Sequence, residues 1–85
     1  MSGLPHNQYV RQAFEASISI LGERTAKILI EDLRHHGIFL IDPELTLDKI
    51  GRGLKELLGH EATELIMQRV IIKLDELYSS RMMSR

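Results

Sequence analysis

The chain has no cysteine, which excludes disulfides and thiolate metal ligands. No apolar run approaches the ~20 residues that a membrane-spanning helix needs. Residues 1–8 also lack the basic and apolar regions of a secretory signal. These absences predict a cytoplasmic protein that does not bind membranes.

Neither sign of charge dominates, because 11 Lys and Arg residues are balanced by 12 Asp and Glu residues, for a net charge of −1. Nucleic-acid-binding domains usually have a basic excess or a concentrated basic face. Two small basic clusters are present, and we interpret both as solvated helix surface. They consist of Arg34, His35 and His36, and of Lys49, Arg52 and Lys55.

A Leu-Gly step occurs twice, at Leu21-Gly22 and Leu58-Gly59, each time between two apolar helical patterns. Two helical segments separated by a glycine are typical of an αα-hairpin. The 85 residues therefore predict a single all-α domain, a compact bundle of four short helices arranged as two hairpins. The expected helices span residues 7–21, 23–36, 47–58 and 61–80, with residues 1–6 and 80–85 as frayed ends.

Helical spacing of apolar residues predicts which side chains form the core. The expected core residues are Phe14, Ile18, Leu29, Leu33, Leu54, Leu58, Ile66, Val70 and Leu74. On the first helix, Leu21 is expected on the same inner face. Thr46 is a suitable N-cap for the third helix. Gly51 and Gly53 flank Arg52 within that helix, and close helix packing or local fraying accounts for them better than a phosphate-binding loop.

The stretch between the second and third helices differs in its residue pattern from the rest of the chain. Its apolar run is too short for a helix and is bounded by Gly37 and by Asp42-Pro43. One interpretation is an extended crossover that plugs the end of the bundle. The alternative is a strand edge that pairs with a second copy or with a partner protein. The residues of this secondary candidate surface are Ile38, Phe39, Leu40 and Ile41.

The fourth helix carries more apolar residues than one stripe can hold. The expected buried stripe contains Ala62, Ile66, Met67, Val70, Ile71, Leu74, Leu77 and Tyr78. Leu65 and Ile72 fall outside this stripe and lie two turns apart on one line. We therefore expect a homodimer through this helix, with Arg69 and Glu76 paired across the rim in an antiparallel register.

No residue pattern in the sequence indicates catalysis. The four histidines, His6, His35, His36 and His60, have no metal-ligand spacing. No serine or threonine has a recognisable base beside it. We expect a protein that is not an enzyme, with no catalytic, cofactor-binding or metal-binding residues.

A family resemblance covers residues 20–78. It rests on three groups of positions: Leu21-Gly22 with Leu29 and Leu33; Asp42-Pro43-Glu44; and Ile50, Leu54 and Leu58-Gly59 leading into Leu65-Ile66. It continues through Val70, Ile71, Ile72 and Leu74 to Leu77-Tyr78. In these positions the chain resembles the small all-helical archaeal domain known as the Nitrosopumilus-type output domain, although the crossover before Ile50 is longer here. The resemblance implies an archaeal, cytoplasmic signalling output module without a catalytic motif.

Two functions from different classes follow. The preferred one is a non-catalytic protein-interaction or regulatory output module that forms a homodimer and binds an unknown protein partner. The alternative is a small helical nucleic-acid-binding regulator, with Lys27 and Arg34 or the Lys49 cluster facing phosphates. Neutral net charge makes nucleic acid the less favoured partner. A small-molecule sensor is a third class, but no residue in the sequence supports it.

Overall fold

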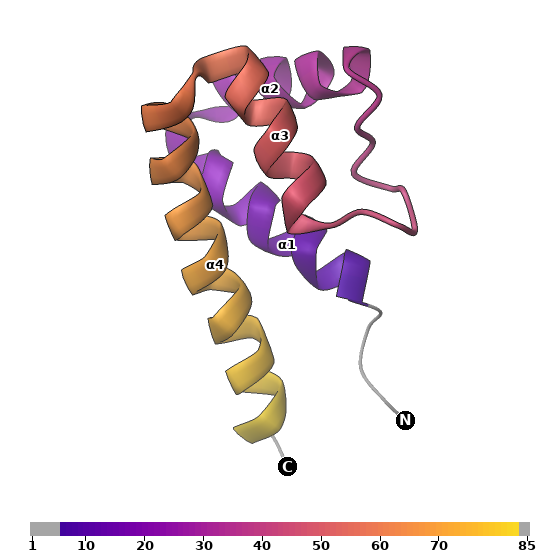
Figure 1. Cartoon of the computed structure of the whole chain (residues 1–85). Coiled ribbons are helices and arrows are strands. Elements are labelled where there is room, and N and C mark those ends of the chain that lie inside the picture. The colour runs from indigo at the N-terminus through magenta and orange to yellow at the C-terminus, as the bar shows by residue number, and fades with distance from the viewer. Residues whose placement is uncertain (1–5, 84–85) are drawn as a thin grey trace.

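The computed structural model describes residues 6–83, and the side chains of residues 6–79. This range contains four α-helices and a short 3-10 helix, η1, and no strand. The elements are α1 (His6–Ile18), η1 (Ser19–Leu21), α2 (Glu23–His35), α3 (Leu47–Leu58) and α4 (His60–Met83), as Figure 1 shows. The predicted all-α fold of four helices is confirmed.

Glycine separates the helices at both Leu-Gly steps. Gly22 and Gly59 have φ angles of 100° and 86°, which glycine adopts at little steric cost and other residues rarely adopt. Gly22 lies between η1 and α2, and Gly59 lies between α3 and α4. The predicted helix breaks are therefore correct. The first helix differs in its last turn, because Ser19–Leu21 tightens into the 3-10 form.

Thr46 caps α3 as predicted, because its Oγ1 accepts a hydrogen bond of 3.2 Å from the backbone N–H of Lys49. We expect Thr46→Ala to lower the free energy of unfolding by about 1 kcal/mol, since that N–H loses its partner. Thr46→Ser keeps the accepting oxygen and should remain close to the wild type. Urea denaturation of the two variants measures the difference, and equal stability would contradict the capping role.

The helices pack differently from two simple hairpins. The most extensive contact is between α1 and α4, while α3 packs on α4 and α2 lies across one end of the molecule (Figure 1). The rings of Tyr9 and Tyr78 lie 4.6 Å apart and join the start of α1 to the late part of α4. The 24 residues of α4 span about 36 Å. Because α4 is longer than α2, it offers α1 a longer surface to pack on. This explains why α1 packs mainly on α4 instead of forming a simple hairpin with α2.

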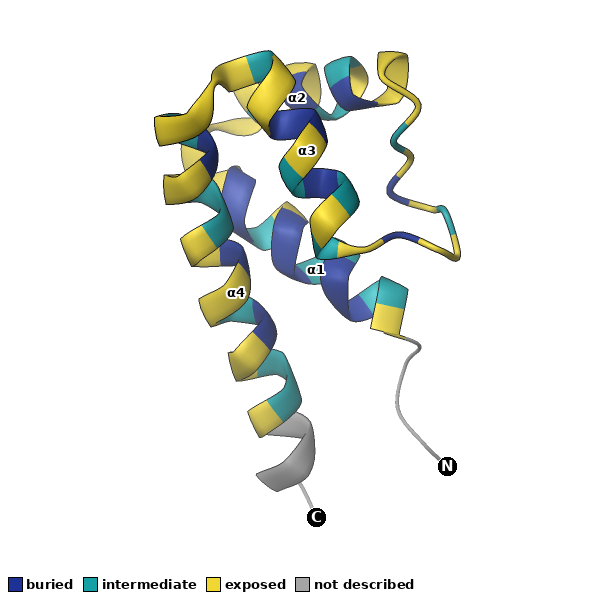
Figure 2. Cartoon of the chain, in the orientation of Figure 1, coloured by how far each residue is buried: buried dark blue, intermediate teal, exposed yellow. Residues whose placement is uncertain are grey.

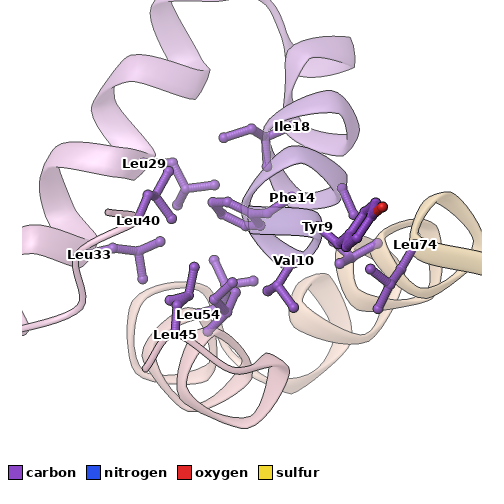
Figure 3. Close-up of a cluster of buried hydrophobic side chains, with 13 residues drawn as sticks. Tyr9, Val10, Phe14, Ile18, Leu29, Leu33, Leu40, Leu45, Leu54 and Leu74 are labelled. Carbon is purple, nitrogen blue, oxygen red and sulfur yellow. The ribbon is translucent and has the colours of Figure 1, made fainter. Parts of the chain in front are cut away.

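A single core lies between the helices (Figure 2). Its buried hydrophobic residues are Tyr9, Val10, Ala13, Phe14, Ile18, Leu29, Leu33, Leu40, Leu45, Ile50, Leu54, Val70 and Leu74. Figure 3 shows Leu29 of α2 beside Phe14 of α1, with Leu33 of α2 in the same cluster. Ile66, predicted as core, is only partly buried against this cluster.

Three predicted core positions are wrong. Leu58 is 41% exposed, because it is the last residue of α3 and the chain turns at Gly59. Leu21 is exposed because the tighter turn of η1 rotates it away from the inner face of α1. Ile71 is exposed because α4 contacts other helices along one side, and the predicted stripe was too broad.

The crossover between α2 and α3 covers the end of the core, but it is a series of turns rather than the extended segment expected, because hydrogen bonds such as Asp42 N–H to the carbonyl of Phe39 fold it back. Leu40 and Leu45 are buried there, and Ile38 packs against the same cluster. No strand forms in this segment, and the burial of Leu40 and Leu45 agrees with the plug interpretation, while pairing with a second copy or a partner protein stays a prediction.

The helix ends extend further than expected. His6 belongs to α1, and α4 continues to Met83. The rest of the expected frayed ends, residues 1–5 and 84–85, lies outside the described residues.

Candidate functional site

Leu65 and Ile72 lie on the side of α4 that faces away from the core. Their exposed fractions are 67% and 59%, as expected from their position outside the buried stripe. Because they are separated by two helical turns, both side chains lie along one line on α4. Figure 2 shows exposed residues recurring along the outward side of this helix. A line of large aliphatic side chains in water is unfavourable unless something covers it.

The 3-10 helix extends this apolar line into a broader surface. Ile20 and Leu21 of η1 are 63% and 47% exposed. Together with Leu65 and Ile72 they line a groove of about 620 Å³ between η1 and α4. We call these four residues the η1–α4 surface. The sequence pattern did not reveal the contribution of Ile20 and Leu21, because it predicted a regular α-helix through residue 21.

Charged side chains border this surface on the flank of α4 that faces α1. Arg69 and Glu76 line a second hollow of about 410 Å³, together with Ser17 and Ile20. Lys73 Nζ lies 3.4 Å from Glu76 Oε1 in an exposed pair one turn apart. Arg69 forms no ion pair with the part of the chain that the structure describes. The predicted rim residues therefore lie on one flank of Ile72, with opposite charges seven positions apart.

The secondary candidate surface on the crossover is smaller than predicted. Leu40 is buried and Ile38 is partly buried, so both contribute to the core. Phe39 and Ile41 are 43% and 78% exposed. Two of the four predicted residues therefore belong to the core and are unsuited to contact a partner.

Carboxylates accompany several cations of the two basic clusters. Arg52 donates hydrogen bonds of 2.7 and 3.2 Å to Asp48 Oδ2. These hydrogen bonds and the negative charge of the carboxylate raise the pKa of Arg52. Lys49 Nζ lies 3.7 Å from Asp42 Oδ2. In the other cluster, Arg34 pairs with Glu31 at 3.3 Å. These pairs reduce the positive potential that a phosphate backbone would meet.

Three of the histidines contact a polar neighbour at the surface. His6 Nδ1 lies 2.7 Å from the hydroxyl of Tyr78. His36 and His60 each lie 3.2 Å from a glutamate, Glu56 and Glu64 respectively. Within residues 6–79, no three side chains of the metal-binding types come together. These histidines therefore lie at helix ends or in surface pairs.

A scan against protein-family models, a search of the curated proteins and a search of the solved structures find no match to this chain. The resemblance to the archaeal output domain therefore stays a prediction from the sequence. Between residues 6 and 83, no helix combines the length and the apolar character needed to cross a membrane. The strongest functional indication is accordingly the η1–α4 surface itself.

Proposed function

We propose that this chain is a non-catalytic protein-interaction module of the cytoplasm that acts as a homodimer through its η1–α4 surface. The observation that carries the proposal is the clustering of four large aliphatic side chains, each 47–67% exposed, around one groove. Scattered exposed aliphatics are normal, whereas a contiguous exposed apolar patch marks an interaction site. Removing this apolar surface from water favours association by roughly 25 cal/mol per Å².

A second surface supports a regulatory role for the dimer. Phe39 and Ile41 are exposed on the crossover, which lies on the side of the molecule opposite to α4 (Figure 1). A dimer built on the η1–α4 surface therefore keeps these two residues accessible to a different protein. Such a module couples self-association to the binding of a partner.

Nucleic-acid binding remains the less favoured function. Readers of nucleic acid gain most of their affinity from cations that neutralise phosphates. Here Arg52, Lys49 and Arg34 each have a carboxylate within 4 Å, which a phosphate would have to displace. Ion pairing of this kind leads us to prefer a protein partner.

The proposal predicts that charge on the η1–α4 surface abolishes the dimer. We expect the double variant Leu65→Glu, Ile72→Glu to be a folded monomer, because burying four carboxylates in the dimer interface is strongly unfavourable. Ile71→Glu is the matched control, since Ile71 lies on the same helix and is 53% exposed but lies outside the surface. Sedimentation velocity reports the mass, and circular dichroism confirms that each variant is helical. A double variant that stays dimeric would exclude this surface.

A further inference from the structure

We infer that a second copy of the chain covers the η1–α4 surface in an antiparallel orientation, with the two Ile72 side chains meeting on the two-fold axis. This inference rests on the proposed function and specifies the occupant and its register. A closed dimer needs a surface that is complementary to itself. The test is therefore whether the charges beside Ile72 complement a copy of themselves.

The flank of α4 that faces α1 has this complementarity. Arg69 and Glu76 both lie on that flank, with Ile72 between them along the helix. When two helices pair antiparallel about a two-fold axis, equal flanks meet. A two-fold axis beside Ile72 then places Arg69 opposite the partner's Glu76, and the symmetry repeats this pair. Two opposite-charge contacts thus border one aliphatic contact.

Other arrangements bring like charges together. If Leu65 met the partner's Ile72 instead, the axis would lie between residues 68 and 69. Arg69 would then lie beside the partner's Arg69. A parallel dimer would bring opposite flanks of the two helices together, which places Glu76 beside the partner's Asp75 from the other flank of Ile72. Like charges at such positions oppose association, so the charge order favours the axis at Ile72.

The length of α4 allows this register to cover the rest of the surface. Leu65 lies roughly 10 Å from Ile72 along the helix. Since α4 continues past Ile72 to Met83, the partner's helix reaches Leu65 from the axis. The groove that Ile20 and Leu21 form beside Leu65 then lies against the partner's α4 near Ser79, the residue that this register places opposite Leu65. The aliphatic residues left exposed in one copy are covered by the other.

Single cysteines test the register without background, because the chain has none of its own. We expect Ile72→Cys to form a covalent dimer under mild oxidation, since the two positions adjoin on the axis. Leu65→Cys should not cross-link, because its two copies lie roughly 20 Å apart and a disulfide requires Cα atoms within about 7 Å. Ile71→Cys is the control for chance collisions. The readout is non-reducing electrophoresis.

Each other cross-linking pattern overturns the inference. Cross-links at both Leu65→Cys and Ile72→Cys would indicate a parallel dimer. A cross-link only when the two variants are mixed would indicate the register in which Leu65 meets the partner's Ile72. In both cases the proposed function would stand, provided that Leu65→Glu, Ile72→Glu is monomeric. A wild-type chain that is itself monomeric would overturn both.

Charge exchange gives a second readout that does not depend on cysteine. Arg69→Glu and Glu76→Arg should each raise the dimer Kd by about tenfold, because each places two like-charge contacts in the dimer. Combining them exchanges the charges and should restore the wild-type Kd. If the combined variant dimerises no better than the single variants, Arg69 and the partner's Glu76 do not meet.

Discussion

Replacing Leu33 with alanine is expected to lower the free energy of unfolding by about 2–5 kcal/mol. Leu33 is fully buried where α2 meets α3 and the crossover, so its removal leaves a cavity that rigid helices do not fill. A small domain has a total stability of about 5–15 kcal/mol. The variant should therefore lose a large part of its stability in urea or thermal denaturation.

Leu58→Ala is the matched control for Leu33→Ala. Leu58 ends α3 and is 41% exposed, although the sequence pattern assigned it to the core. We expect this variant to lose about 0.5 kcal/mol or less. Both variants are compared at one protein concentration, because dimerisation adds to apparent stability. If Leu33→Ala melts like the wild type, the core has been assigned to the wrong face of α2.

We expect Gly53→Ala and Gly51→Ala in α3 to change the free energy of unfolding in opposite directions. A Cβ on Gly53 would lie 2.8 Å from Leu33 Cδ2 and would also overlap Ile38 Cδ1. Leu33 is fully buried, and close-packed interiors leave little room for a displaced side chain, so overpacking costs about 1–3 kcal/mol. The better helix propensity of alanine offsets about 0.5–1 kcal/mol of that cost. We expect Gly53→Ala to lower the free energy of unfolding by about 1 kcal/mol.

Gly51→Ala provides the control on the same helix. The nearest atom to a Cβ on Gly51 is Met67 Cε at 3.9 Å, which is an ordinary contact distance. Only the gain in helix propensity remains, so we expect the free energy of unfolding to rise by about 0.5–1 kcal/mol. Denaturation of both variants gives the two signs. A stabilised Gly53→Ala would show that α3 does not need its close approach to α2 and the crossover.

The sequence predicted the helices well because their ends depend on local chemistry. Gly22 and Gly59 occupy positive-φ positions, and Thr46 supplies its oxygen to a backbone N–H three residues away. The core was less predictable, because burial depends on which helices meet. Leu40 and Leu45 are buried by tertiary packing of a segment that has no helical period. Ile71 was misplaced for the same reason.

The candidate site was half predictable. Leu65 and Ile72 belong to a regular helix, so angular position alone placed them outside the buried stripe. Leu21 was not predicted because the change from α to 3-10 geometry turned it outward, and the sequence pattern gave no reason to place Ile20 beside Leu65. Their proximity to Leu65 also arises from the antiparallel packing of α1 on α4, which no local pattern encodes.

The central claim is that this chain associates with itself, and equilibrium sedimentation of the unmodified protein tests it most directly. The monomer has a mass of 9.8 kDa. Twice that mass at micromolar concentration, falling toward the monomer on dilution, is the result that the η1–α4 surface predicts. A mass of 9.8 kDa throughout the micromolar range would contradict the claim.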